Sequence, residues 1–316
     1  MVQSNSIAST CETAFGIPAW VWGIAVVAIA AYVFIGGVGR LAVVTEKIVP
    51  IMAIVYLVGG LIVLFANLPA TGEAFGLIFS CAFNPQAEIG GVTFGILAAL
   101  AQGAKRGLFS NEAGMGSTPH AHAQANVKNP HEQGTVALIG VFVDTFIVVT
   151  ITALVVISVL YTGNGALAQG AYEGIDKTNM AQLAFGTVFG TTGGNVFVAI
   201  CLLFFAFSTI LSWNLFAKIN VQYLFGKKAV PVFTVIALIF IFMGSLLSND
   251  LVWELADMFN QLMVLPNVIG LIALGGGVAA CARTAGKSWG KAAAKIERER
   301  EEGINTSNPD KPNWEA

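Results

Sequence analysis

Long apolar runs recur along the whole chain, and they restrict its fold more than any other feature. A helix rises about 1.5 Å per residue, so about 20 apolar residues are needed to cross about 30 Å of lipid hydrocarbon. Five runs reach that length: Ile17–Val38, Ile48–Asn67, Gly134–Tyr161, Asn195–Ala217 and Ala229–Leu247. Two further apolar runs, Gly90–Ala104 and Leu251–Ala280, are interrupted or bordered by polar residues. The chain is therefore predicted to be an all-α polytopic membrane protein with about seven crossings.

The composition excludes several classes of partner. Hydrophobic residues make up 56% of the 316 residues and charged residues only 11%, whereas soluble domains carry about 25% charged residues. The 16 Lys and Arg are balanced by 18 Asp and Glu, so no basic face is available for nucleic acid. The four cysteines show no CxxC spacing. We expect the lipid bilayer as a partner, no nucleic acid and no cofactor.

The positions of the basic residues predict the topology, because cytoplasmic loops are enriched in Lys and Arg. Seven crossings place thirteen of the 16 Lys and Arg on one side, which is then taken as the cytoplasmic side of the inner membrane. The run Leu251–Ala280 contains Pro266 and Asn267, which disturb a helix. Two short crossings there would put the basic tail outside, so one broken crossing is predicted. The transporter domain is expected at 1–282 and a charged cytoplasmic tail at 283–316.

A glycine-rich polar stretch, GAKRGLFSNEAGMGS at 103–117, falls at membrane depth. A continuous helix is not expected there, and irregular backbone in a bilayer must be buried in protein or line a wet cavity. In transporters such breaks direct helix termini at an anionic group and free carbonyls at a cation. An amino acid zwitterion with Na⁺ satisfies both requirements. The alternative is a cytoplasmic or re-entrant loop with a glycine-rich turn.

A second polar stretch, FAFSTILSW at 205–213, interrupts an otherwise apolar span. Its Ser and Thr hydroxyls can bond back to a carbonyl one turn earlier, which would be purely structural. Adjacent hydroxyls could equally supply the hard oxygen ligands that Na⁺ prefers. Trp213 follows Thr209 by four residues, so the two lie on one helix face, where Trp213 could form the wall of a small pocket.

Ionisable side chains inside the predicted spans should face the bundle interior, since each costs about 2.5–3.5 kcal/mol at a helix centre. Asp144 and Arg106 are predicted to pair with each other, with a gating or proton-relay role as the alternative. A metal site at His120, His122 and Glu112 is not expected, because residues at i and i+2 of a helix point apart.

At these stretches the sequence resembles the alanine or glycine:cation symporter family, also called sodium:alanine symporters. The likeness includes GAKRGLFSNEAGMGS, the AHA at 121–123, VFVDT at 141–145 and FAFSTILSW. It continues through VWELAD at 252–257 and LMVLPN at 262–267, and upstream it includes QSNSIA at 3–8 and TEKIVPIMAIVY at 45–56. The resemblance therefore covers nearly the whole chain.

The resemblance implies a LeuT-type fold, in which two inverted repeats of five helices hold substrate and sodium beside two broken helices. Ile17–Val38 would be the fourth core helix, and the FSNEAG region the break of the sixth. The residues implied as substrate-binding are Phe109, Ser110, Asn111, Thr209, Ile210, Trp213 and Gln3, with Asn5 as a further candidate. Ser208 and Thr209 are implied as a sodium site.

The likeness begins after the family's first three helices. The first broken helix, which supplies much of the substrate shell in this fold, is therefore expected to be absent. A chain that lacks about the first three helices is not expected to transport alone. A truncated gene product, an incomplete sequence and half of a split protein are all compatible with this pattern.

The predicted function is sodium-coupled symport of a small neutral amino acid, alanine or glycine, with Na⁺ as the coupling ion. The alternatives are a cation channel and a membrane-embedded enzyme. An enzyme would need a nucleophile and base arrangement that the sequence does not offer. A channel would need a continuous polar lining, whereas the polar residues cluster at two sites.

Overall fold

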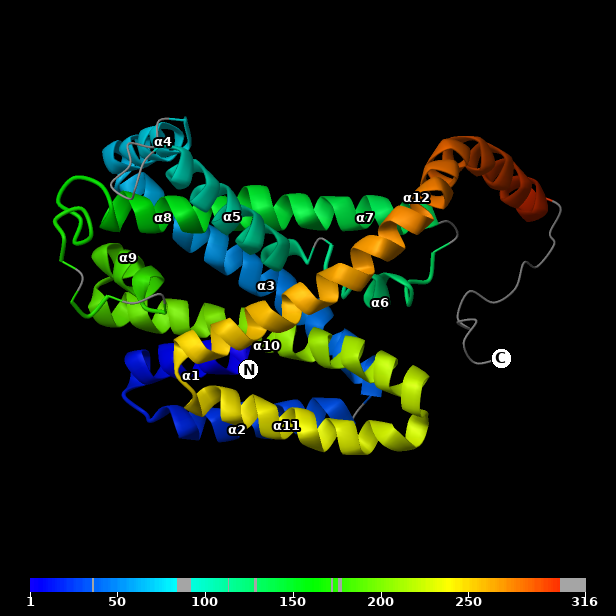
Figure 1. Ribbon diagram of the computed structural model, residues 1–316, viewed down its shortest axis with the longest axis horizontal. Coiled ribbons are helices and arrows are strands. Elements are labelled where there is room, and N and C mark those ends of the chain that lie inside the picture. The colour runs from blue at the N-terminus through cyan, green and yellow to red at the C-terminus, as the bar shows by residue number, and fades with distance from the viewer. Residues whose placement is uncertain are drawn as a thin grey trace.

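The computed structural model describes residues 1–35, 37–83, 92–112, 114–127, 130–171, 173–175 and 178–301, and within these ranges it contains helices and no strands (Figure 1). In chain order the elements are α1 (Val2–Phe15), α2 (Ala19–Ile35), α3 (Gly37–Ala66), α4 (Leu68–Phe83), α5 (Val92–Asn111), α6 (Pro119–His122), α7 (Pro130–Phe142), the π-helical stretch η1 (Val143–Val149), α8 (Thr150–Leu160), α9 (Met180–Phe189), α10 (Thr191–Phe225), the 3₁₀ turn η2 (Lys227–Ala229), α11 (Val230–Leu246) and α12 (Asn249–Glu301). The prediction of an all-α polytopic membrane protein is confirmed at this level.

Five helical segments of the described chain are long and apolar enough to cross a membrane: Val49–Ala66, Pro130–Leu160, Thr191–Phe225, Lys227–Leu246 and Asn249–Ala279. The predicted first crossing appears as α2, an apolar helix of 17 residues. The predicted interrupted crossing appears as α5, 20 residues long, which carries Lys105 and Arg106.

The predicted crossing Ile48–Asn67 is confirmed by the membrane-length segment Val49–Ala66, although the helix that contains it, α3, begins at Gly37 and includes Pro50. One predicted helix break is wrong. Helix α12 runs without a break from Asn249 to Glu301 and includes Pro266. A proline inside a membrane helix removes one backbone hydrogen bond, which neighbouring helices can compensate. The predicted division at 282/283 falls within this one helix and stays a prediction.

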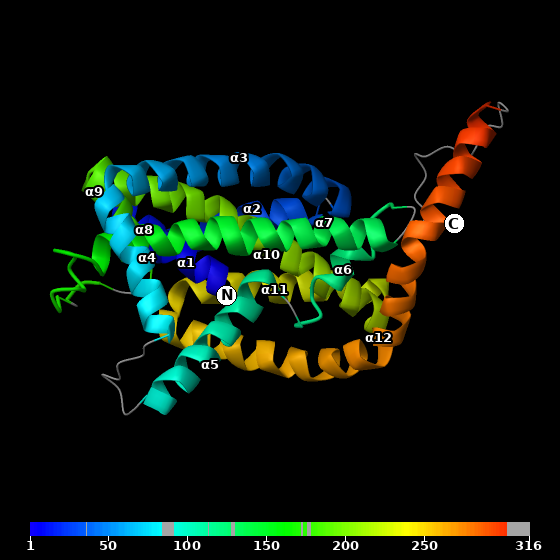
Figure 2. The same cartoon turned by 90° about the horizontal axis from the view of Figure 1, so that it is seen from above.

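Helix α10 lies between two apolar clusters (Figures 1 and 2). One cluster joins it to α1, α2 and α11, and includes the fully buried Ile7, Ala30 and Leu211. The other joins it to α3, α4, α8 and α9, and includes the fully buried Val63 and Phe185. These eight helices form the packed body of the molecule, which we call the scaffold.

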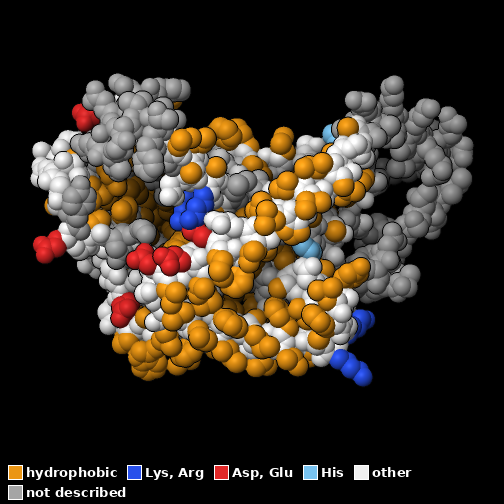
Figure 3. Space-filling model, viewed as in Figure 1, with side chains coloured by type: hydrophobic (Ala, Val, Ile, Leu, Met, Phe, Trp, Pro, Cys, Tyr) orange, Lys and Arg blue, Asp and Glu red, His pale blue; other side chains and the backbone are white. Residues whose placement is uncertain are grey.

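Two of the basic residues, Lys227 and Lys228, lie in one connection at an end of the molecule. The connection from α10 to α11, which carries Lys227 and Lys228, lies at the same end as the start of α7 and the far part of α12 (Figure 1). Figure 3 shows Lys and Arg side chains beside this connection and a further basic cluster nearer the middle of the molecule, next to acidic side chains. The predicted sharing of one side by the basic loops stays a prediction.

Candidate functional site

The chain leaves the helical conformation directly after α5. Glu112 has φ 56°, and the glycines that follow have φ 78° at Gly114 and φ 81° at Gly116. Left-handed backbone is disfavoured for residues with a Cβ, so the two glycines permit this turn. The predicted break is confirmed at Glu112 and at 114–118, but Gly103 and Gly107 lie inside α5. An isolated glycine weakens a helix without ending it, whereas the EAGMGS segment cannot continue one.

Side-chain hydrogen bonds stabilise this break. The carboxylate of Glu112 accepts from the hydroxyls of Ser117 at 2.6 Å and Thr118 at 3.1 Å. The Asn267 amide of α12 donates to the Gly114 carbonyl at 2.8 Å. A Cβ on Gly116 would lie 2.8 Å from Asn267 Oδ1, so α12 closely approaches the break. Asn267 therefore binds the broken segment instead of breaking its own helix.

The last two residues of α5 contact the π-helical stretch η1. Ser110 Oγ donates to Asp144 Oδ2 at 2.7 Å, and Asn111 Nδ2 donates to Thr145 Oγ1 at 3.5 Å. A π-helical turn inside a longer helix is uncommon and often marks a functional position. The η1 stretch thus faces the end of α5 with a carboxylate and a hydroxyl.

The basic residues of α5 pair with α12, and the predicted Arg106–Asp144 pair is wrong. Lys105 Nζ lies 2.6 Å and Arg106 Nη1 3.3 Å from the Asp257 carboxylate. Arg106 also lies over the Trp253 ring, 4.6 Å from its centroid. Two cations thus share one carboxylate, which is well covered at 13% exposed. Arg106 lies one turn before Ser110, beside α12, whereas the contacts of α5 with η1 are made by Ser110 and Asn111 at its end.

Phe109 packs against the same tryptophan, with ring centroids 5.2 Å apart. Trp253 stands out neither by charge nor by helical break, so site reasoning from the sequence missed it, although it lies in the VWELAD motif. The signal that could have identified it is its position four residues before Asp257, which places the aromatic ring and the carboxylate on one helix face inside a span.

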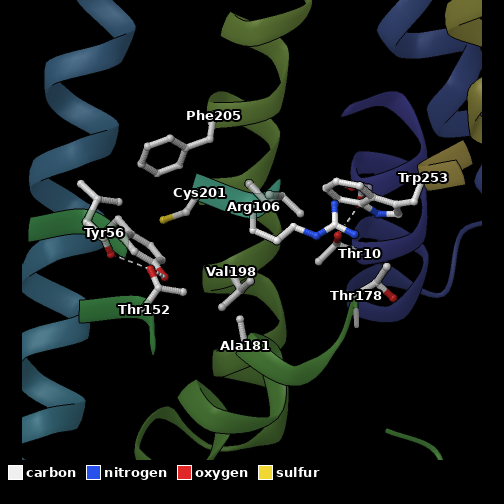
Figure 4. A pocket seen from close by; sticks show the side chains of 13 residues that line it. Thr10, Tyr56, Arg106, Thr152, Thr178, Ala181, Val198, Cys201, Phe205 and Trp253 are labelled. Atoms are coloured by element: carbon white, nitrogen blue, oxygen red, sulfur yellow. Dashed lines mark hydrogen bonds between the residues drawn. The ribbon is translucent and has the colours of Figure 1, made fainter. Parts of the chain in front are cut away.

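A cavity of ≈ 530 Å³ opens between α5 and the scaffold (Figure 4). Arg106 and Trp253 lie on one side, and Tyr56, Thr152 and Phe205 on the other. The Tyr56 hydroxyl bonds Thr152 Oγ1 at 2.8 Å. The volume falls in the range of about 300–1,000 Å³ typical of small-molecule sites.

Helix α1 supplies Ser6 and Thr10 to the lining of this cavity. Gln3 lies seven residues before Thr10, so the two share a helix face and Gln3 extends the polar side of α1. Asn5 points elsewhere: it is 6% exposed and donates to the carbonyls of Gly244 at 3.0 Å and Leu247 at 2.7 Å. Asn5 therefore attaches α1 to the end of α11.

The predicted residues of α10 divide between two environments. The hydroxyls of Ser208 and Thr209 donate to the Phe205 carbonyl at 2.9 and 3.0 Å, the back-bonded arrangement typical of membrane spans. Thr209 follows Phe205 by four residues and continues the face that lines the cavity. Ile210 is 7% exposed inside the cluster with α1 and α2.

Trp213 is partly buried and packs against Phe216 one turn later, with centroids 6.1 Å apart. The described contacts of Phe109 and Ser110 go to α12 and η1. The structure thus brings Phe109, Ser110 and Asn111 together at the end of α5. Their meeting with Thr209, Ile210, Trp213 and Gln3 around one substrate stays a prediction.

The two histidines after the break contact neutral partners. His120 bonds Asn220 of α10 at 3.2 Å, and His122 bonds Gln133 at 2.8 Å. Within the described ranges no three His, Cys, Asp or Glu side chains gather around one point. These contacts attach the short α6 to α10 and α7.

Comparison with known proteins relates the chain to membrane carriers. The family model described as the sodium:alanine symporter family matches residues 1–296. The sodium/alanine symporter AgcS of Methanococcus maripaludis is 37% identical over 276 residues, which cover 87% of this chain and 59% of that protein. The sodium/proton-dependent alanine carrier protein of Bacillus sp. PS3 is 35% identical over 283 residues, 86% of this chain and 63% of that protein.

A further relative is the probable sodium/glutamine symporter GlnT of Bacillus subtilis, 33% identical over 276 residues. These residues cover 86% of this chain and 55% of that protein. The chain thus spans little more than half to three fifths of the length of these curated relatives.

Proposed function

The chain belongs to the sodium:alanine symporter family, and from this membership we propose that it carries a small neutral amino acid, alanine or glycine, across the cytoplasmic membrane together with Na⁺. The family resemblance predicted from the motifs is confirmed by the match over residues 1–296. The family is one of transporters and not of enzymes, so nothing favours the enzyme alternative.

The break after α5 is the observation that carries this proposal. Helix termini at membrane depth present free backbone groups that a bound ion or zwitterion can satisfy. Here α5 ends at Asn111 beside a charged pair and a cavity, with left-handed backbone at Glu112, Gly114 and Gly116. A loop with only a structural role would not require a charged pair and free backbone groups inside a bundle of apolar spans.

We place the substrate between the end of α5 and α10. Phe109, Ser110 and Asn111 provide one side, and Thr209, Ile210 and Trp213 the other. Gln3 supplies an amide from α1. Partly buried Trp213 restricts the pocket, which favours alanine, glycine or serine over larger side chains.

Ser208 and Thr209 are the proposed sodium ligands on α10. Each hydroxyl uses its proton on the Phe205 carbonyl, which leaves the oxygen lone pairs free for a cation. Back-bonding and sodium binding are therefore compatible for these two residues.

We also infer a LeuT-type arrangement in the inner membrane with the end of α12 in the cytoplasm. In that arrangement α2 is the fourth core helix, α5 and α6 flank the break of the sixth, and α10 is the eighth. The position of Lys227 and Lys228 in the connection between α10 and α11 supports the orientation. Rocking of one helix group against another would then expose the site to either side in turn.

Because the chain alone is not expected to transport, uptake of labelled alanine is measured in proteoliposomes with a full-length protein that contains this chain and the family's first three helices. The transport variants below are made in that protein. An inward Na⁺ gradient is expected to drive accumulation, and replacing Na⁺ by choline should abolish it. Competition by unlabelled glycine, serine and glutamine then ranks the substrates, and the small ones should compete best. Uptake that ignores the Na⁺ gradient would overturn the proposal.

Trp213→Ala tests the pocket, with Trp20→Ala as a matched control because Trp20 is 53% exposed on α2. Trp213→Ala is expected to lower alanine uptake about tenfold, equivalent to about 1.4 kcal/mol of lost stabilisation. It should also improve competition by glutamine, since the pocket is widened. Equal alanine uptake by the two variants would remove Trp213 from the site.

A further inference from the structure

Helix α12 continues well past its apolar part. The membrane-length segment of α12 ends at Ala279, whereas the helix runs on to Glu301. Near the end of that segment the side chains are exposed rather than packed on another helix, with Ile272 77% and Val278 65% exposed. Arg283 follows Ala279 by four residues, so the basic part of α12 begins at the depth where a span meets the lipid headgroups.

The residues that follow the span divide into two opposite stripes along the helix. Successive residues of an α-helix are about 100° apart around its axis, because one turn takes about 3.6 residues. The basic residues, spaced by three or four, fall within a stripe about 120° wide: Arg283, Lys287, Lys291, Lys295 and Arg298. The apolar residues fall within a stripe about 100° wide on the other side: Ala282, Ala285, Trp289, Ala292, Ala293 and Ile296. A basic stripe opposite an apolar stripe with a tryptophan is typical of a helix that lies in the membrane interface.

This part of α12 can turn away from the direction of the span. Three consecutive glycines, at 275–277, precede it, and glycine weakens a helix locally. A Cβ at any of them would meet nothing within 4 Å, so no described helix packs closely on the backbone there. Figure 1 shows α12 changing direction in its far part, and in Figure 2 this part extends beyond the other helices. The helix can therefore cross the membrane with its first part and lie along the surface with its last.

We propose that residues 282–298 form an interfacial helix that binds anionic lipids at the membrane surface where α12 emerges. In this arrangement the apolar stripe lies toward the acyl chains, and the basic stripe attracts the phosphate groups of neighbouring lipids. The arrangement gives the molecule a lipid partner and is independent of which amino acid it carries.

Charge, more than apolar area, determines the strength of this binding. Four of the six apolar residues are alanines, and only Trp289 and Ile296 are large. Burying so small an apolar area stabilises binding weakly, whereas each basic residue adds attraction to a negatively charged surface. Acidic residues begin at Glu297, so the attraction is confined to the part of the helix nearest the span. A bilayer that contains anionic lipid should therefore hold the helix, and a zwitterionic bilayer should not.

Hydrogen exchange measured by mass spectrometry tests the binding on the full-length protein that contains this chain. The protein is placed in nanodiscs of phosphatidylcholine alone or of phosphatidylcholine mixed with phosphatidylglycerol. The backbone amides of 282–298 are expected to exchange about tenfold more slowly in the discs with phosphatidylglycerol, because binding suppresses local unfolding. Raised salt should remove most of this difference, since it screens the charges.

Substitutions of three lysines separate charge from helix formation. Lys287→Gln, Lys291→Gln and Lys295→Gln together should abolish the slower exchange, whereas Lys287→Arg, Lys291→Arg and Lys295→Arg together should keep it. Lysine, glutamine and arginine have similar helix preferences, so the unbound helix is about equally stable in both variants. Lys227→Gln with Lys228→Gln, at the α10–α11 connection, removes charge elsewhere and should change nothing.

Trp289→Ala tests the apolar stripe, because it leaves every charge in place. It should speed the exchange of 282–298 severalfold in the discs with phosphatidylglycerol, and an unchanged rate would overturn the interfacial placement.

Equal exchange of 282–298 in the two kinds of disc would overturn the proposal as a whole. Fast exchange in both would make this part of α12 a solvated helix, and slow exchange in both would assign it to contacts within the protein. The exchange rates do not depend on transport, so failure of the proposed function would leave these outcomes unchanged.

Discussion

The scaffold around α10 and the region around the end of α5 are held together by different forces. The scaffold buries large side chains completely, such as Phe185 and Leu211, and its few polar groups anchor backbone carbonyls. Gln182, 1% exposed, donates to the carbonyls of Thr10 and Asn195 and so joins α9 to α1 and α10. The break region instead relies on Ser110–Asp144 and Lys105–Asp257 contacts, with an exposed helix end.

This difference indicates which part of the molecule can change its conformation. Close-packed interfaces cannot deform continuously, whereas polar contacts between two elements can exchange for ions or water at small cost. We therefore expect substitutions in the scaffold to reduce stability and substitutions at the break to reduce transport. Two pairs of variants and one single variant test this separation, from the largest expected effect to the smallest.

Gly194→Ala should have the largest effect, a loss of stability, because the added methyl group separates two helices of the scaffold. A Cβ at Gly194 would lie 2.3 Å from the Gly186 nitrogen of α9, and backbone cannot move aside as a flexible side chain can. Overpacking of this kind costs about 1–3 kcal/mol, seen as a lower melting temperature in detergent. At the neighbouring Gly193 the added Cβ would meet only Phe189 Cβ, at 3.4 Å.

Gly193→Ala is thus the matched control, and the helix preference of alanine over glycine should keep its melting temperature at or slightly above that of the wild type. Equal destabilisation by the two variants would mean that the α9–α10 interface is not close-packed.

Asp257→Asn should affect transport more than stability. It leaves Lys105 and Arg106 without their shared carboxylate, and the two cations then repel each other beside the break. Alanine uptake is expected to fall about tenfold, which corresponds to about 1.4 kcal/mol. The melting temperature should change little, since both cations are more than a third exposed and water screens the pair.

Glu254→Gln is the control for Asp257→Asn, because Glu254 is an exposed carboxylate one turn earlier on the same helix. Its uptake should match the wild type. A large drop in melting temperature for Asp257→Asn, with normal uptake, would assign the ion pair to the scaffold instead.

Much of the fold could be predicted from apolar length alone, because the bilayer fixes how many residues a crossing needs. The ends of the helices could not be predicted in this way. Pro266 predicted a break that α12 does not have, and the polar residues Arg40 and Lys47 suggested a loop where the backbone is helical from Gly37. Both errors arise because tertiary neighbours decide whether a local helix breaker is tolerated.

The candidate site was predictable in its chemistry and less so in its partners. The glycines of the 103–117 stretch predicted the break, and Gly114 and Gly116 do have the left-handed backbone that few other residues adopt. Arg106 pairs with Asp257 and not with Asp144 because α12 lies beside this part of α5. A single sequence contains no information on which helices lie side by side. The packing of Trp253 on Arg106 could not be predicted for the same reason.

Tyr56→Phe should have the smallest effect, and it locates the boundary between the two regions. It removes the hydroxyl that bonds Thr152 at 2.8 Å, while the ring keeps its contacts with Phe185 and Phe205 at 5.7 Å each. Thr152 still donates to the Val148 carbonyl at 2.8 Å, so no buried group is stranded, and the loss should be about 0.5–1 kcal/mol.

Tyr56 lines the cavity but belongs to the scaffold cluster, so uptake measured beside the melting temperature decides its role. Unchanged uptake with a slightly lower melting temperature would make this wall a passive part of the scaffold, as the comparison predicts. A tenfold loss of uptake, as expected for Asp257→Asn, would instead extend the transport machinery across the cavity to α3.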